Sequence, residues 1–216
     1  MYKSYKTPWA IMLFATILLL AACASGGFLK AAQPVEGMIT NYETGEPVPD
    51  AFVVARWTGT SGGLGHSGGA ICFHVEVTRT DAEGQYFIPP PKIRPEYADY
   101  RKPRILITAY KPGYRRPYWV NDVPSPTDQL IDSDETPHER ISYLLDVRKN
   151  ISCMQAGESE QNLLVIYKSL YTESVRFAET KDEKITAFSL LQNIESIELG
   201  GDEASKRFYE RLKELQ

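Results

Sequence analysis

The chain has 216 residues, of which 24 are basic and 28 acidic, and its formal net charge is −4 at pH 7. An acidic chain of mixed charge lacks the basic patch that nucleic-acid binding requires, so we expect no nucleic-acid partner. The length suits one domain of ordinary size with an appendage, and it is enough to bury a hydrophobic core.

The N-terminus has the layout of a secretory signal peptide. Lys3 and Lys6 precede an almost purely apolar run over residues 10–22. Such a run is typical of the apolar core of a signal, and it is too short for a comfortable membrane span, which needs about 20 residues. The first 22 residues are therefore expected to direct export.

The apolar run ends in Leu20-Ala21-Ala22-Cys23, which resembles the lipobox of bacterial lipoproteins. The resemblance implies a diacylglyceryl group on the Cys23 thiol, removal of residues 1–22 and acylation of the new amine. Two or more acyl chains anchor a protein stably. Ala24, where Asp would retain an enteric lipoprotein, resembles outer-membrane sorting, so we expect a lipid anchor in the bacterial outer membrane, facing the periplasm. The alternatives are an ordinary cleaved signal or an uncleaved anchor, with Cys23 present by chance.

Residues 23–34 are rich in small side chains and are interpreted as the lipidated tether. A segment of this length reaches at most about 40 Å when fully extended. Loss of Lys3 and Lys6 with the leader changes the net charge from −4 to −6. The lipid, and not a basic patch, must therefore hold the folded part close to the membrane.

Two further cysteines, Cys72 and Cys153, remain after lipidation of Cys23. The cell envelope permits disulfides, so we expect these two to be bonded to each other. The alternative is a pair of buried free thiols. Neither lies in a Cys-x-x-Cys motif, which argues against a redox site.

Residues 35–150 are rich in β-branched and aromatic side chains and carry frequent turn signals, which is typical of an antiparallel sandwich. The clearest strand is 71–80, where apolar and polar side chains alternate. We predict a seven-strand sandwich of transthyretin-like type, with strands over 35–40, 51–57, 71–80, 85–88, 104–110, 115–120 and 141–147. A polar loop with prolines is expected over 121–137.

Residues 157–216 contain no proline, and their apolar side chains recur at helical spacing. Thr180 and Glu183 match a capping box for a second helix, and Gly200-Gly201 matches its end. Asp202 is expected to cap a third, short helix. We predict a two- or three-helix segment that packs against the sandwich.

Three motifs resemble the carboxypeptidase regulatory-like, or transthyretin-like, domain. They are VEGMI at 35–39 with TGEPVPDAFVV at 44–54, TDAEGQYF at 80–87, and AYKPGY at 109–114. The resemblance implies a non-catalytic accessory sandwich that positions or binds a partner. Independently of the family, Gly45 and Gly84 suit turn positions of positive φ, and Asp81 suits an Asx turn. The link over 58–70 is longer and richer in glycine than is usual in the family.

No motif indicates a metal, a cofactor or a catalytic group. His66, His74 and His138 lack the close ligand pairs of zinc sites. The glycine-rich stretch 59–69 lacks the lysine of a phosphate-binding loop and is expected to be a mobile surface loop. We therefore expect no metal, no cofactor and no catalytic site.

Aromatic residues follow one another between residues 97 and 119, interspersed with arginines. Both residue types are enriched at interface hot spots, and flat aromatic rings can stack on sugars. The alternative is that half of them belong to the core and the rest cover its edge. The candidate binding surface comprises Tyr97, Tyr100, Tyr114, Tyr118 and Trp119.

The preferred function is that of a membrane-anchored lipoprotein acting as a non-catalytic binding or assembly module. Its partners would be the membrane, through the lipid anchor, and an envelope protein or a glycan. Two alternatives stay open, namely a carbohydrate- or peptidoglycan-binding module and an unrecognised envelope hydrolase.

Overall fold

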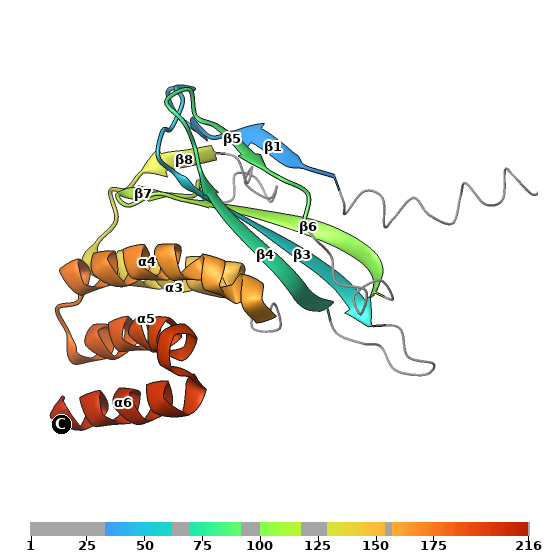
Figure 1. Ribbon diagram of the computed structural model, residues 1–216. Coiled ribbons are helices and arrows are strands. Elements are labelled where there is room, and N and C mark those ends of the chain that lie inside the picture. Colours follow the sequence, from blue (N-terminus) through green and yellow to red (C-terminus); the bar gives the residue numbers. More distant parts are fainter. Residues whose placement is uncertain (1–32, 62–69, 92–99, 118–128, 154–156, 216) are drawn as a thin grey trace, which may run out of the picture.

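A computed structural model describes residues 33–61, 70–91, 100–117, 129–153 and 157–215. The fold is mixed α/β. Its strands form three sheets, and its helices are stacked on one side of them (Figure 1). The strands are β1 (Val35–Met38), β2 (Thr40–Asn41), β3 (Phe52–Ser61), β4 (Ala70–Arg79), β5 (Gln85–Ile88), β6 (Tyr100–Tyr110), β7 (Tyr114–Arg115) and β8 (Gln129–Asp132). The helices are α3 (Pro137–Ile151), η2 (Gly157–Leu163), α4 (Leu164–Phe177), α5 (Lys181–Leu199) and α6 (Gly201–Glu214).

Three long strands form the central antiparallel sheet, in the order β4-β3-β6. Strand β3 lies in the middle, and its side chains are buried on both faces. Phe52 and Val54 join the core beneath the helices, whereas Val53 and Trp57 join a second core on the opposite face. Because alternate residues of a strand point to opposite faces, one strand serves both cores.

The short strands cover the face of the central sheet that the helices leave free. β1 pairs with β5 in antiparallel register, while β8 lies between β2 and β7 and is parallel to β2. Ile88 of β5, Leu130 of β8 and Ile39, which lies between β1 and β2, are fully buried in the second core. The strands predicted over 35–40, 51–57, 71–80, 85–88 and 104–110 are therefore present, most of them with different ends, but a single seven-strand sandwich is not confirmed.

The predicted strand over 141–147 is wrong, because these residues form the middle of helix α3. Thr136 and Glu139 make a capping box at its start, and Pro137 occupies the first turn. Ile141, Leu144, Val147 and Ile151 are buried on one face. Their separation of three to four residues is the period of a helix, and Pro at the first helical position is favourable because its missing N–H needs no partner there.

The predicted capping box of the second tail helix is confirmed. The Thr180 hydroxyl accepts from the Glu183 N–H, and the Glu183 carboxylate accepts from the Thr180 N–H at 2.9 Å. Helix α5 ends at Leu199, and its C-cap is Gly200, whose φ of 93° suits glycine. A third helix, α6, is present, but Gly200 precedes it as its N-cap and Asp202 lies inside its first turn. Asp202 is therefore not the cap that the sequence suggested.

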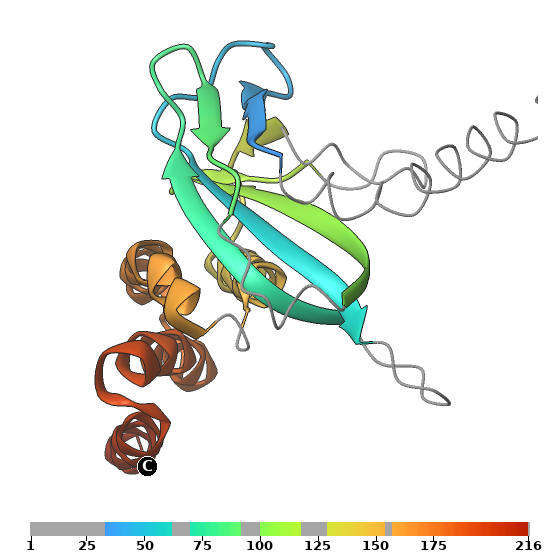
Figure 2. The same ribbon diagram turned by 45° about the vertical axis from the view of Figure 1, so that its right-hand side comes forward.

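The helices are stacked away from the sheet in succession. α3 and α4 lie next to the central sheet, α5 packs on α3 and α4, and α6 packs on α5 (Figures 1 and 2). Within the described residues, no helix is long and apolar enough to cross a membrane.

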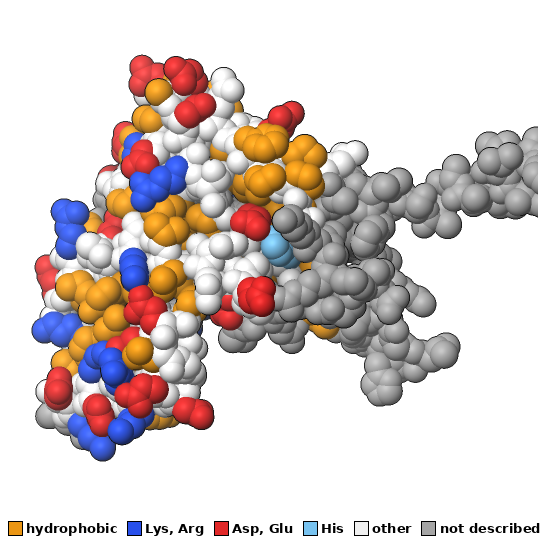
Figure 3. All heavy atoms as spheres, in the orientation of Figure 1, with side chains coloured by type: hydrophobic (Ala, Val, Ile, Leu, Met, Phe, Trp, Pro, Cys, Tyr) orange, Lys and Arg blue, Asp and Glu red, His pale blue; other side chains and the backbone are white. Residues whose placement is uncertain are grey.

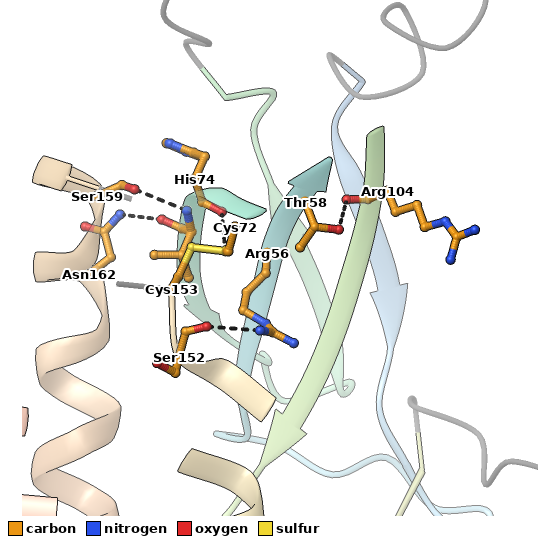
Figure 4. The surroundings of a disulfide bond; sticks show 10 residues. Arg56, Thr58, Cys72, His74, Arg104, Ser152, Cys153, Ser159 and Asn162 are labelled. Atoms are coloured by element: carbon orange, nitrogen blue, oxygen red, sulfur yellow. Dashed lines mark hydrogen bonds between the residues drawn. A yellow bond between two sulfur atoms is a disulfide. The ribbon is translucent and has the colours of Figure 1, made fainter. Parts of the chain in front are cut away.

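Cys72 and Cys153 form the predicted disulfide, with Cα atoms 5.2 Å apart (Figure 4). The bond joins strand β4 to the segment that follows α3. Nearby, the Arg56 guanidinium donates to the Ser152 carbonyl at 3.0 Å, while Ser159 and Asn162 of η2 bond to the backbone of Val75 on the edge of the sheet. The end of α3 and η2 are thus attached to the same sheet by covalent and polar contacts.

Candidate functional site

Residues of the first and second motifs lie next to each other in the antiparallel pair of β1 and β5. Gly37 lies opposite Tyr86 in the β1–β5 pair, and a Cβ at position 37 would come within 2.7 Å of the Tyr86 Oη atom. Only a residue without a side chain lets this ring lie against the backbone of β1. The first motif and the second motif of the sequence are therefore parts of one packing unit.

The turn before β5 is held by groups that the sequence indicated. The Asp81 carboxylate accepts from the backbone N–H of Glu83 and of Gln85, which confirms the expected Asx turn. Gly84 has a φ of 73°, and a Cβ there would lie 2.6 Å from the Ile39 carbonyl oxygen. Glycine is required at this position both for its backbone conformation and for the close approach of a neighbouring strand.

The opposite face of the β1–β5 pair is open and combines two large apolar side chains with two polar ones. We call it the β1–β5 face, and it consists of Glu36, Met38, Gln85 and Phe87, which the register places together. Met38 is 47% exposed and Phe87 is 55% exposed. Figure 3 shows hydrophobic side chains gathered over these strands. A hollow of about 720 Å³ lies along the pair, and its lining includes both apolar side chains.

Charged groups border this hollow. Arg79 donates to the Asp50 carboxylate at 2.5 Å and lies over the Phe52 ring, 4.1 Å from its centroid. Both contacts hold the guanidinium on the side of β4, while the carboxylates of Glu36 and Asp81 line the hollow. The site therefore offers two exposed apolar side chains among polar and charged groups, of which two are acidic and one is basic.

Of the five aromatic residues in the candidate binding surface, the structure describes the side chain of Tyr114 alone. Tyr97, Tyr118 and Trp119 lie outside the described residues, and so does the side chain of Tyr100. Tyr114 is half-buried and packs against the second core. Lys111 lies 4.8 Å from its ring centroid, and burial and nearby Asp132 raise the pKa of Tyr114. Tyr114 thus contributes to the packing of the protein body.

A buried ionic cluster at the junction of sheet and helices has no counterpart in the sequence predictions. The Glu173 carboxylate on α4 accepts from Arg140 of α3, from the Tyr110 hydroxyl and from the Gly113 N–H, at 2.5 to 3.1 Å. Arg140 also donates to Glu135 at 3.1 Å and to the Tyr114 carbonyl at 2.7 Å.

This cluster holds helices α3 and α4 to the sheet. Arg140 and Glu173 are 1% and 4% exposed, and burial together with Glu173 raises the pKa of Tyr110 strongly. A buried carboxylate is stable when it is hydrogen-bonded, and the Glu173 carboxylate accepts from three residues. No spacing in the sequence could have indicated it, because its members come from four separate elements.

The histidines occupy separate parts of the molecule. His74 Nε2 lies 2.9 Å from the Glu76 carboxylate on β4, and His138 Nδ1 lies 3.6 Å from Glu183 on α5. His66 lies outside the described residues, as do Cys23 and most of the glycine-rich stretch 59–69. Among the residues that the structure describes, no group of three or more His, Cys, Asp or Glu could hold a metal ion.

Comparison of the chain with protein-family models, with curated proteins and with solved structures gave no match.

Proposed function

We propose that this chain is a lipid-anchored protein of the bacterial envelope that works by contact, as a binding or assembly module. The observation that carries the proposal is the sequence Leu20-Ala21-Ala22-Cys23 at the end of a short apolar run. A lipobox at this place would make Cys23 the first residue of the mature chain and give it the acyl chains that hold it in a membrane.

Two features of the folded part are consistent with this location. The Cys72–Cys153 disulfide suits a compartment outside the reducing cytosol. Strand β1 begins at Val35, twelve residues after Cys23, so the folded part would remain within about 40 Å of the membrane. Both features would serve a protein that works at the membrane surface.

The contact role rests on the resemblance to carboxypeptidase regulatory-like domains and on the open β1–β5 face. Gly37, Asp81, Gly84 and Tyr86 of the matching motifs have structural roles that hold the β1–β5 pair in place. Accessory domains of this type present surfaces to partners. The exposed Met38 and Phe87 supply such a surface, and the membrane that holds the anchor is among the partners that it could meet.

The test is cell fractionation of the full chain, expressed with a C-terminal tag in an enteric host. We expect the protein in the outer membrane, with an N-terminal peptide whose mass carries diacylglyceryl and acyl groups on Cys23. The variant Cys23→Ser should remain unprocessed or be released in soluble form. A Cys23→Ser protein that is cleaved normally and stays in the membrane would contradict the proposal.

The variant Ala24→Asp is a matched control for sorting. It leaves Cys23 intact, so lipidation should continue, but the protein should remain at the inner membrane if position 24 sets its destination. Both membranes can be separated by density, so one experiment reads anchoring and sorting independently.

A further inference from the structure

We propose that the β1–β5 face rests on the lipid bilayer to which Cys23 is anchored, so that the domain has a fixed orientation at the membrane. This inference depends on the proposed lipid anchor, and it adds the orientation of the anchored domain. The occupant of the open face is the bilayer surface itself.

The first argument is the arrangement of the apolar side chains. Glu36 pairs with Phe87 and Met38 with Gln85, so Met38 and Phe87 are diagonal neighbours on one face of the strand pair. Both are about half exposed. Large apolar side chains that stand together on a surface mark contact with a protein or with a membrane.

The second argument is the place where the tether joins the fold. The segment from Cys23 leads directly into Val35, and Met38 follows three residues later in the same strand. The tether reaches at most about 40 Å, so the β1–β5 pair is the part of the fold that the anchor holds nearest to the membrane. α6, by contrast, lies at the other end of the molecule (Figures 1 and 2).

The third argument concerns affinity. Two side chains alone offer little area for binding a bilayer from solution. A protein that is already anchored makes the same contact intramolecularly, at a high effective concentration set by the tether length. A small apolar face therefore suffices to orient the domain once the acyl chains hold it.

The charges favour apolar contact over electrostatic attraction. Arg79, the cation beside the hollow, is engaged by Asp50 and Phe52, and Glu36 and Asp81 add negative charge. The face carries no cluster of basic side chains among its described residues that would draw it to anionic lipids. Met38 and Phe87 therefore make the contact with a neutral bilayer, at the depth of the headgroups, where the Glu36 carboxylate keeps its water.

The experiment uses the chain from Cys23 onward, which contains every residue that the structure describes. With Cys72 and Cys153 joined, Cys23 has the free thiol and can be coupled to a maleimide lipid in neutral phosphatidylcholine nanodiscs. Chemical coupling replaces the cellular anchor, so failure of lipidation in cells and failure of this inference are separate results.

The measurement is the broadening of methionine methyl signals by gadolinium chelated on lipid headgroups. Met38 supplies one signal, assigned by its loss in Met38→Leu, and Tyr209→Met supplies a reference methyl on α6, where the native side chain is 64% exposed. We expect the Met38 methyl to broaden strongly and the reference methyl on α6 to broaden little.

A second pair of variants tests the face itself. Phe87→Ser should reduce the excess broadening at Met38 to the smaller excess that the nearby tether alone produces, whereas Tyr209→Ser should leave it unchanged. Excess broadening that Phe87→Ser leaves unaltered would overturn the inference. Equal broadening of the Met38 methyl and the reference methyl would overturn the inference. A dimer of the uncoupled chain in sedimentation that Phe87→Ser dissociates would also overturn it, because the occupant of the face would then be a second copy.

Discussion

Glu173 and Arg140 form an ion pair between helices α4 and α3, with the Nη2 and Nε atoms 2.7 and 3.1 Å from one carboxylate oxygen. The same carboxylate receives the Tyr110 hydroxyl and the Gly113 N–H from the sheet side. One buried side chain therefore connects two helices to the end of β6.

Removing either partner of this pair should destabilise the fold strongly. Arg140→Ala leaves the Glu173 charge buried without its main partner, so we expect the free energy of unfolding to fall by about 3–5 kcal/mol. Urea unfolding measures the change. Asp146→Ala, which breaks the exposed pair with Lys149 at 3.4 Å, is the control and should cost less than about 1 kcal/mol. Similar losses for the two variants would contradict a role for burial.

Gly45 and Gly84 have nearly equal φ values but different surroundings, so substitutions at the two positions can be compared directly. Gly45 and Gly84 have φ values of 72° and 73°, but a Cβ meets nothing within 4 Å at Gly45 and meets the Ile39 carbonyl at 2.6 Å at Gly84. We expect Gly45→Ala to cost about 1 kcal/mol from the backbone conformation alone, and Gly84→Ala about 3 kcal/mol because a strand must also shift. Equal thermal shifts would show that the close approach is unimportant.

The disulfide closes a long segment of chain, since its two cysteines are 81 residues apart. Replacing both by Cys72→Ala and Cys153→Ala should lower the free energy of unfolding by about 4 kcal/mol, because the unfolded chain gains freedom. Addition of reductant to the native protein should have the same effect, and it should have none on the double variant. Mass spectrometry that finds two free thiols in the unreduced protein would refute the bond.

Acid should destabilise the protein through carboxylates at helix starts. Hydrogen bonds with Thr136 hold the pKa of Glu139 below its usual value of 4.5, and backbone N–H groups of Thr180 and Glu179 do the same for the pKa of Glu183. Because the folded-state pKa lies below the unfolded one, this stabilisation is complete above about pH 5 and is lost as the pH falls through the folded pKa.

The measurement is the urea midpoint between about pH 6 and pH 3. Glu139→Gln with Glu183→Gln should weaken its pH dependence. Thr180→Ala, which removes a hydroxyl but keeps both backbone donors to Glu183, should retain most of it. An unaltered slope in the double glutamine variant would contradict the assignment.

The sequence indicated elements whose signals are local. The turn at Asp81 and Gly84 is one, and the capping box at Thr180 and Glu183 is another, because a few adjacent residues determine each of them. Helix α3 was missed although Thr136 and Glu139 carry the same capping signal. Ile141, Tyr143, Leu145 and Val147 also alternate with other residues, so the segment fits a strand period as well as a helical one.

Features that depend on distant parts of the chain could not be predicted. Strand β8 has four residues and exists because β2 and β7 pair with it on either side. The Glu173 cluster draws on β6, the following turn, α3 and α4. For the β1–β5 face, the sequence predicted the two strands, but their pairing and the exposure of Met38 and Phe87 follow from how the second layer packs.

The succession of helices away from the sheet implies a gradient of local stability. α3 and α4 share the main core, but α6 contributes one fully buried side chain, Ala204, and packs mainly on α5. Elements with few buried contacts open at lower free energy than the core. Amide hydrogens of α6 should therefore exchange with solvent first, those of α5 next and those of β3 last, so the C-terminal end can open while the sheet beside the tether stays intact.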